Sequence, residues 1–218
     1  MTLQLKANSD AIRDALRRHG RYELFHWTPA ARLPSVLEQG LLCRRELEAR
    51  TVAYDAHGYG RAGKEEDFAG FVCVSFLPSW GMMRRETGPL AVIEMPSTIA
   101  GIDRSFYCPD NTARNDYEFD EVSTWTELEH FEALFAGPNE WKLSNLQAEV
   151  WIPDGIPVDF FRTVYFRSDE DLQDALRACE PLAANLPREL NFRVKMTHFP
   201  DPDYEKPDDL DWEEIPIR

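Results

Sequence analysis

The stretch from Phe25 to Leu42 reads FHWTPAARLPSVLEQGLL. Its first residues predict a short apolar strand with an inward histidine, His26. A helix of about two turns should follow, and Gly40 should end it before the next two leucines. A lone histidine on an apolar strand is more often a satisfied core residue than a ligand. The stretch alone therefore predicts a strand and a helix, and it leaves the role of His26 open.

A second informative stretch lies far downstream, where residues 146–153 read LQAEVWIP. This pattern predicts a strand in which Glu149 stands between Ala148 and Val150. An isolated buried carboxylate is costly to desolvate, so Glu149 should either be paired or take part in chemistry. The alternative is an edge strand on which Glu149 points into water.

Length and composition narrow the class of protein. The chain has 218 residues, 43% of them hydrophobic, which predicts one full core, a single domain with a short tail. No apolar run approaches the roughly 20 residues of a membrane span, and the first 20 residues are too charged for a signal peptide. The four cysteines are far apart and show no C-x-x-C spacing, which predicts a reduced, cytoplasmic protein without disulfides, zinc or another metal.

The formal net charge of −15 is unlike the basic footprint of most nucleic-acid binders. Eight acidic and two basic residues lie between Phe199 and Arg218, so this segment carries −6 and the rest carries −9. We therefore expect a domain over residues 1–198 and a solvated acidic tail over residues 199–218. The alternative is that Tyr204, Trp212 and Ile215 dock the tail across a basic groove as a nucleic-acid mimic.

The rest of the chain alternates between helices and short strands. A capped helix is predicted from Ser9 to a glycine stop at Gly20, and further helices are predicted over residues 126–135 and 169–179. Strands are predicted over residues 68–76, 89–95, 147–152 and 163–166, and turns over residues 107–115. Neither a βαβ rhythm nor a G-x-G-x-x-G or Walker motif is present, which excludes a Rossmann domain.

Four blocks together resemble the DarT family of bacterial toxins, which are NAD-dependent ADP-ribosyltransferases acting on bases of single-stranded DNA. In chain order they are HWTPAARLPSVLEQGLL, FAGFVCVSFLPSWGMM, YCPDNTARN and QAEVWIP, and the resemblance extends from about Tyr22 to Phe166. Two positions depart from the family pattern, because Arg32 replaces an asparagine and the segment Ser75 to Ser79 replaces a Tyr-Phe-x-Pro-Arg block. The resemblance implies an α+β ADP-ribosyltransferase fold, in which two small packed β-sheets form an NAD cleft surrounded by helices.

Residue roles follow from the same resemblance. Glu149 would be the catalytic glutamate, and Arg61 would be the second catalytic residue, with Arg50 as the alternative. NAD would be the co-substrate, and no metal is implied. The residues expected to contact NAD are His26, Thr28, Leu33, Gly40, Tyr54 and Phe76, and those expected to contact the acceptor are Trp141, Lys142 and Asn145. Asp110 and Asn111 match a family turn, although an Asx-turn that caps a helix is the favoured explanation. His130 is expected to be an ordinary helix residue.

These observations do not decide which molecule accepts the ADP-ribose. Single-stranded DNA is favoured by the resemblance and RNA is an alternative. The basic pairs Arg44-Arg45 and Arg84-Arg85 favour nucleic acid, whereas the overall charge argues against it. A transferase acting on protein, or a non-catalytic binding module on the same fold, is the competing class. The resemblance also implies a toxin held by a cognate antitoxin or used in phage defence.

Overall fold

The computed structural model describes residues 4–51, 68–78, 83, 88–109, 118–135, 137, 143 and 148–200. The helices are α1 (Ser9–Arg18), α2 (Leu33–Gln39), α3 (Arg44–Ala49), α6 (Phe119–Val122), α7 (Leu128–Ala133) and α8 (Asp169–Cys179). The strands are β1 (Glu23–Pro29), β2 (Leu41–Leu42), β3 (Phe71–Ser75), β4 (Leu90–Pro96), β5 (Phe106–Cys108), β6 (Glu149–Pro153), β7 (Gly155–Ile156), β8 (Thr163–Phe166) and β9 (Asn191–Val194). Short 3-10 turns are η1 (Ala30–Arg32), η2 (Phe68–Gly70), η3 (Ser97–Gly101), η4 (Val158–Phe160), η5 (Glu180–Asn185) and η6 (Met196–His198).

Seven strands form the main sheet, in the order β5-β6-β3-β1-β4-β8-β9, and β2 pairs with β7 in a second, two-stranded sheet. All neighbours in the main sheet are antiparallel except β8 and β9, which are parallel. Helix α8 connects these two parallel strands, as a parallel pair requires a crossover. The chain therefore belongs to the α+β class, as predicted.

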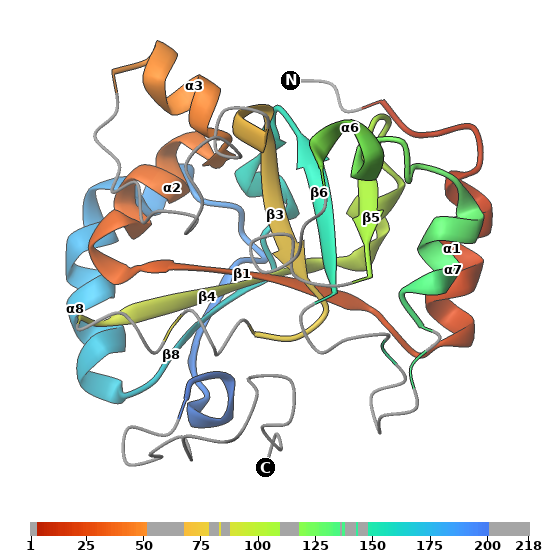
Figure 1. Ribbon diagram of the computed structural model, residues 1–218. Helices are drawn as coiled ribbons and strands as arrows, with labels where there is room; N and C mark the ends of the chain where they lie inside the picture. The colour runs from red at the N-terminus through yellow and green to blue at the C-terminus, as the bar shows by residue number, and fades with distance from the viewer. Residues whose placement is uncertain are drawn as a thin grey trace, which may run out of the picture.

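The main sheet consists of two halves that meet at one residue pair. Strand β1 pairs with β4 along all seven residues, but its register with β3 is the single pair Phe25–Ser75. In Figure 1, β3 and β6 stand steeply while β1 and β4 run almost across them. The predicted pair of small sheets thus corresponds to two halves, β5-β6-β3 and β1-β4-β8-β9, joined at a narrow junction.

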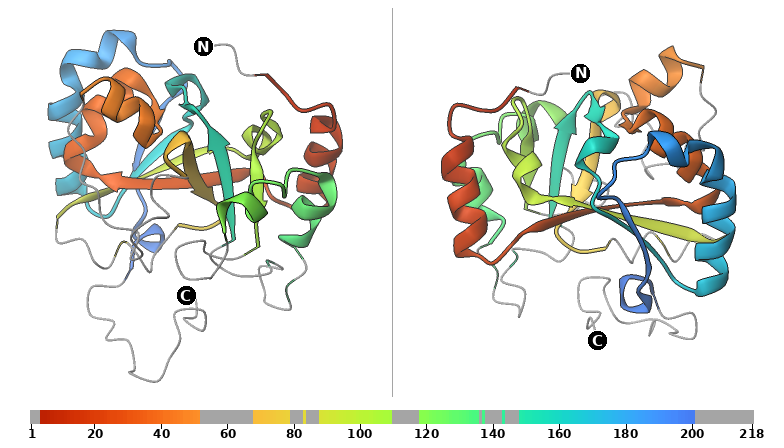
Figure 2. Two further views of the ribbon diagram at one scale, coloured as in Figure 1. Left: turned by 45° about the horizontal axis from the view of Figure 1, so that its top comes forward. Right: turned by 180° about the vertical axis from the view of Figure 1, so that it is seen from behind.

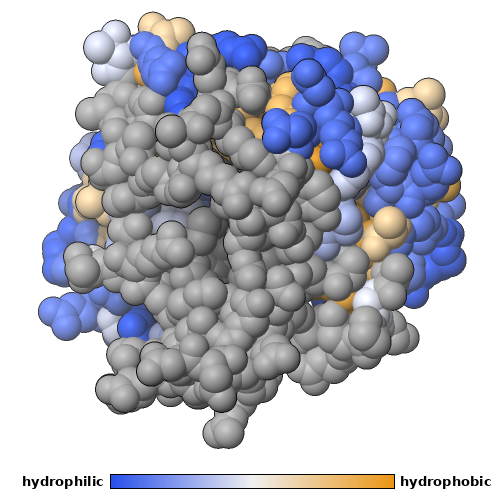
Figure 3. Space-filling view, in the orientation of Figure 1, coloured by the Kyte–Doolittle hydropathy of each residue, from blue (hydrophilic) through white to orange (hydrophobic). Residues whose placement is uncertain are grey.

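Helices cover the two ends of the sheet. Helix α1 packs beside α7 at one end, whereas α2 packs beside α8 at the other (Figures 1 and 2). Apolar residues at helical spacing cause this packing, because Ile12 and Leu16 of α1 and Leu33 and Leu37 of α2 are buried in the same large core cluster. The flank over α1 and α7 is mostly hydrophilic in Figure 3. On α1, salt bridges such as Arg13–Asp10 (3.0 Å) lie on the exposed surface.

Most of the predicted elements are confirmed. Helix α1 ends as expected, because Gly20 has φ +64° and the amides of Gly20 and Arg21 donate to the carbonyls of Arg17 and Leu16, which is a Schellman motif. Helix α8 has the predicted bounds, and the Ser168 side chain caps it by accepting from the Asp171 amide. Helix α7 is shorter than the predicted segment 126–135.

Three predictions of local structure were wrong or incomplete. The strand predicted over residues 68–76 begins only at Phe71, because Phe68–Gly70 is the 3-10 turn η2. The turn predicted to begin at Tyr107 is wrong there, since Phe106–Cys108 is strand β5, fully buried against β6. Strand β9 was not predicted, because in Asn191–Val194 only Phe192 packs against the core. Both strands owe their existence to a partner distant in sequence, and neither shows a clear alternation of its own.

The expected boundary between domain and tail, after residue 198, lies within a packed part of the structure. Phe199 is buried in a cluster with Met83, Leu90, Val92 and Tyr165. Residues 201–218 lie outside the described residues, so the division into a 1–198 domain and a 199–218 tail stays a prediction.

In the part of the chain that the structure describes, no helix is long and apolar enough to cross a membrane.

Candidate active site

The site is built around the junction between the two halves of the sheet. Beyond Phe25, β1 separates from β3, so the described register leaves the segment from His26 to Pro29 paired with β4 only. A strand edge of this kind presents backbone donors and acceptors that are ready to bind another molecule. Among the described residues, the junction therefore combines a strand edge that pairs on one side only with side chains that come from both halves.

His26 spans the separation between β1 and β3. Its Nδ1 lies 2.9 Å from the carbonyl oxygen of Cys73. A carbonyl can only accept, so Nδ1 must carry the hydrogen in this contact. Burial lowers the pKa of His26, although the hydrogen bond to Cys73 raises it in part, so the imidazole is neutral at pH 7. In the neutral ring Nε2 is then an acceptor, suited to a hydroxyl donor.

Glu149 is the first residue of β6 and lies on the other side of the junction. It pairs in register with Ser75 of β3 and Cys108 of β5, and only 5% of its surface is exposed. The carboxylate is hydrogen bonded, because the indole Nε1 of Trp151 donates to its Oε2 over 3.1 Å. The prediction that Glu149 lies on a buried strand and is paired is therefore confirmed, and the edge-strand alternative is wrong.

The register fixes how near the two halves bring these residues. Phe25, Ser75 and Glu149 are successive partners across β1, β3 and β6. Strands are spaced by about 4.8 Å, so the Cα atoms of Phe25 and Glu149 are about 10 Å apart. His26 follows Phe25 directly. The register thus places the backbones of His26 and Glu149 on two strands that only β3 separates, although the residues are far apart in the sequence.

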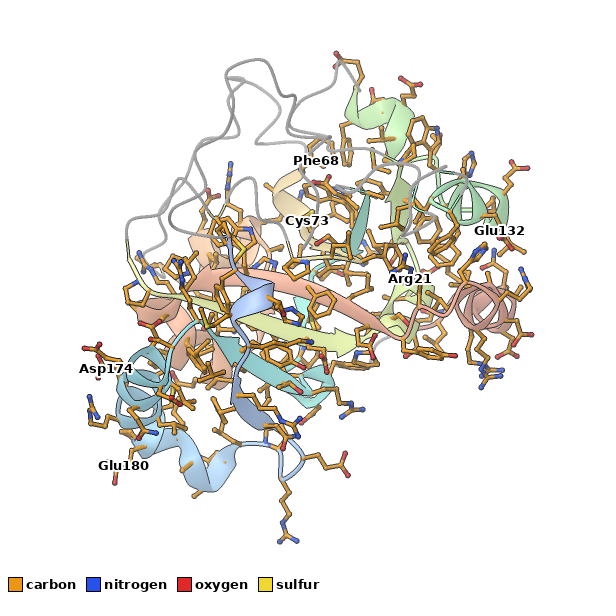
Figure 4. All side chains as sticks on the ribbon, turned by 90° about the horizontal axis from the view of Figure 1, so that it is seen from below. Arg21, Phe68, Cys73, Glu132, Asp174 and Glu180 are labelled. Atoms are coloured by element: carbon orange, nitrogen blue, oxygen red, sulfur yellow. The ribbon has the colours of Figure 1, made fainter. Side chains whose placement is uncertain are left out.

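A cluster of aromatic rings lies behind the carboxylate. The Trp151 ring is stacked on Phe106, with centroids 5.8 Å apart and an interplanar angle of 3°. It also contacts Phe68, whose centroid is 4.6 Å away. Figure 4 shows Cys73 at the centre of the molecule, between Phe68 and β1. These rings form a dry backing on the sheet face that carries Glu149.

The Cys73 thiol is a further partner of the carboxylate. Burial raises the pKa of Cys73 well above its ordinary value, and the charge and hydrogen bond of Glu149 raise it more. The thiol is therefore protonated at neutral pH. All four cysteines of the chain are free thiols.

The other predicted cofactor residues lie around the first helix and strand. Thr28 is 8% exposed on β1, two residues from His26 and on the same face. Leu33 is fully buried in the core. The Phe76 ring is buried between Phe131 and Phe135, in edge contacts with centroids 6.4 and 5.2 Å away. The roles of these residues toward a cofactor stay predictions, and the positions of Leu33 and Phe76 favour packing behind the site.

Gly40 has a structural reason to be glycine. Its φ of +83° is rarely adopted by other residues, and a Cβ there would lie 2.5 Å from the carbonyl oxygen of Ile156. Gly40 lets β2 approach β7 closely, whatever it does toward a cofactor.

Several predicted residues lie outside the described residues. These are Arg61, Tyr54, Trp141, Lys142, Asn145, Asp110, Asn111, Arg84 and Arg85. Arg50, the alternative to Arg61, follows α3 and pairs with Glu46 over 3.2 Å. His130 is half-buried on α7 and stacked on Trp125, as expected of a helix residue.

Sequence reasoning did not single out Cys73 and Trp151. The period of two in a strand could have indicated Trp151, because residues 149 and 151 of one strand share a face. Cys73 could not be found in this way, since its place depends on the register of β3 against β6.

Comparison with known proteins finds similarity at the level of structure. No protein-family model and no curated protein sequence matches the chain. Thermosipho africanus DarTG in complex with ADP-ribose superposes with a TM-score of 0.57 at 18% identity, covering 81% of this chain. Thermus sp. 2.9 DarT in complex with ADP-ribosylated ssDNA gives 0.57 at 13% identity over 83% of this chain, and its NAD+ complex gives 0.55 at 13% over 82%.

The extent of the match differs between these proteins. The chain spans 50% of the DarTG chain but 97% of the Thermus DarT chain. The similarity thus includes nearly all of DarT and half of DarTG. Together with the split sheet and the helices at its two ends, it shows that this chain has the fold of the DarT ADP-ribosyltransferases.

Proposed function

We propose that this chain is an NAD-dependent ADP-ribosyltransferase that modifies a base of single-stranded DNA. The observation that carries the proposal is that His26 and Glu149 approach the junction of the sheet from its two halves. The shared fold supports the choice of substrates, because Thermus DarT is seen with NAD+ and with ADP-ribosylated ssDNA.

Glu149 supplies the chemistry that this transfer needs. Breaking the bond between nicotinamide and C1′ of the ribose gives a transition state with oxocarbenium character. A buried carboxylate that accepts from the ribose 2′-OH stabilises the positive charge as it develops. The same carboxylate can take the proton from the attacking nitrogen of the base. One glutamate therefore serves cleavage and transfer.

His26 and the open edge of β1 would hold the cofactor. The neutral imidazole has its Nδ1 hydrogen committed to the Cys73 carbonyl, so Nε2 can accept from a ribose hydroxyl. Thr28 on the same face can donate its hydroxyl. These contacts orient the ribose toward Glu149 and raise the effective concentration of the reacting groups.

The remaining assigned residues complete the proposal. Arg61 would bind the diphosphate of NAD or orient the acceptor, because a guanidinium has five fixed donors and a permanent charge. Tyr54 would stack on nicotinamide or a flipped base, and Trp141, Lys142 and Asn145 would contact the acceptor.

The test is to incubate the chain with labelled NAD and single-stranded DNA, with RNA and a protein lysate in parallel. We expect label on DNA, and we expect Glu149→Gln to lower the rate by at least about a thousand-fold. Glu94→Gln is the matched control, because Glu94 lies in the neighbouring half of the sheet and accepts from Tyr165 and Thr163. We expect Glu94→Gln to transfer at nearly the wild-type rate.

Other outcomes would change the assignment. Label on RNA or protein alone would contradict the DNA acceptor, and a wild-type chain that neither cleaves NAD nor transfers label would contradict the enzyme. His26→Gln should mainly raise the KM for NAD and Glu149→Gln should mainly lower kcat, because His26 would hold the ribose in the ground state while the charge of Glu149 acts in the transition state.

We also propose that the transferase acts as a toxin. Modified bases block templating, so expression of the chain in bacteria should arrest growth and expression of Glu149→Gln should not. A cognate antitoxin, as in a toxin-antitoxin or phage-defence system, would relieve the arrest. Growth arrest that persists in Glu149→Gln would contradict a toxic transferase activity.

A further inference from the structure

A neutral donor holds the Glu149 carboxylate, because the Trp151 indole donates to its Oε2 over 3.1 Å. Cys73 of the adjacent strand is the register partner of Trp151, so the two side chains lie side by side across β3 and β6. The charge of Glu149 reaches the Cys73 thiol, whose pKa it helps to raise. The indole donor favours the ionised form of the carboxylate and restricts its rotation.

The surrounding core fixes the direction of the indole. Trp151 is 2% exposed, and Phe106 lies parallel to its ring while Phe68 packs at an angle of 47°. A ring held on two sides cannot turn without opening a cavity, because protein interiors are close-packed. The position of the N–H is therefore set by the aromatic cluster, and the carboxylate follows the N–H.

The contact could have been merely structural. A buried indole N–H needs an acceptor, and a backbone carbonyl would serve. Here the acceptor is the one acidic side chain of β6, at the strand end next to the junction with β1. An indole that holds this carboxylate changes how the carboxylate binds protons and where it points, which a structural contact elsewhere would not do.

We infer that Trp151 is a positioning residue for Glu149. The inference rests on the proposed function, since it concerns the orientation of the catalytic carboxylate. The aromatic cluster of Phe68, Phe106 and Trp151 then transmits its rigidity to the site through one hydrogen bond.

The first test is Trp151→Phe, which keeps an aromatic ring and removes the donor. Loss of a hydrogen bond to a charged group should lower kcat about ten-fold. The KM for NAD should stay within about two-fold, because binding contacts are unchanged. A carboxylate without this donor binds its proton more tightly, so the acid limb of the pH profile should move up by about one pH unit.

Phe106→Leu is the matched control. It loosens the stack on Trp151 but keeps the indole N–H donor, so it should lower the melting temperature and move the acid limb less than Trp151→Phe does. Cys73→Val should lower kcat less than Trp151→Phe does, because a thiol is at most a weak donor. An acid limb and kcat unchanged in Trp151→Phe, or an acid limb moved equally by Phe106→Leu, would overturn the inference.

A second readout does not depend on activity. The indole ¹⁵N–¹H signal of Trp151 can be identified by its absence in Trp151→Phe. In the wild-type chain it should shift as Glu149 titrates, and in Glu149→Gln this pH dependence should disappear. If the chemical shift of this signal changes neither with pH nor in Glu149→Gln, the inference that Trp151 positions Glu149 is refuted. A signal that responds in a chain without transferase activity would retain the contact and refute only the proposed function.

Discussion

Gly40 joins α2 to β2, and replacing it by alanine should destabilise the chain through its backbone. At φ +83° and ψ −179° the residue lies in a region that is essentially restricted to glycine, which costs other residues about 1–3 kcal/mol. An added Cβ would also meet the Ile156 carbonyl oxygen at 2.5 Å and the Pro157 Cα at 3.2 Å. These are backbone atoms, so β7 must move, and such overpacking costs about 1–3 kcal/mol.

The expected loss for Gly40→Ala is about 3 kcal/mol, after subtracting the gain from a stiffer unfolded chain. Gly20→Ala is the matched control, because Gly20 also has positive φ but no atom lies within 4 Å of its Cβ position. That variant should lose only about 1 kcal/mol. For a domain of this size the melting temperatures should fall by about 9 °C and about 3 °C, respectively.

The two variants should be compared by urea unfolding at constant pH and by calorimetry. The comparison isolates close approach, since both substitutions are alanine for a glycine with positive φ. Equal losses in the two variants would refute the argument that the backbone of β7 makes Gly40 necessary.

Two further predictions concern stability. Burial and the charge of Lys195 lower the pKa of His198 to about 4, and its Nε2 has no hydrogen-bond partner among the described residues. Between pH 6.5 and 4 the unfolded chain then binds more protons than the folded chain. The free energy of unfolding should therefore decrease by about 1–2 kcal/mol as the pH falls through this window, a figure reduced because the ring is partly exposed. The variant His198→Phe keeps a ring between Phe25 and Tyr165 but cannot titrate. Urea unfolding at pH 7 and 4.5 should therefore show a smaller loss of stability in the variant than in the wild-type chain, and an equal loss in both would contradict the role of His198. Ser168→Ala should cost about 1 kcal/mol by calorimetry because it removes the α8 cap, and an unchanged melting temperature would show that the cap is dispensable.

Local chemistry made much of the fold predictable. Gly20 ends α1 because positive φ favours glycine, and Ser168 starts α8 because its hydroxyl accepts a free amide at the helix start. The strand around His26 and the strand around Glu149 follow from apolar runs. Strand β9 could not be predicted, because its pairing with β8 depends on a crossover through α8 and not on its own residues.

The sequence by itself determined the ends of α1 and α8 and the two strands that carry His26 and Glu149, because these depend on neighbours along the chain. Only the tertiary structure decided that β1 meets β3 at a single pair and that Glu149 lies two strands from Phe25. It also decided that Trp151 holds the carboxylate and that Cys73 lies beside Trp151. Strand register is a property of two segments at once, set by the packing of both faces, and no single segment contains it.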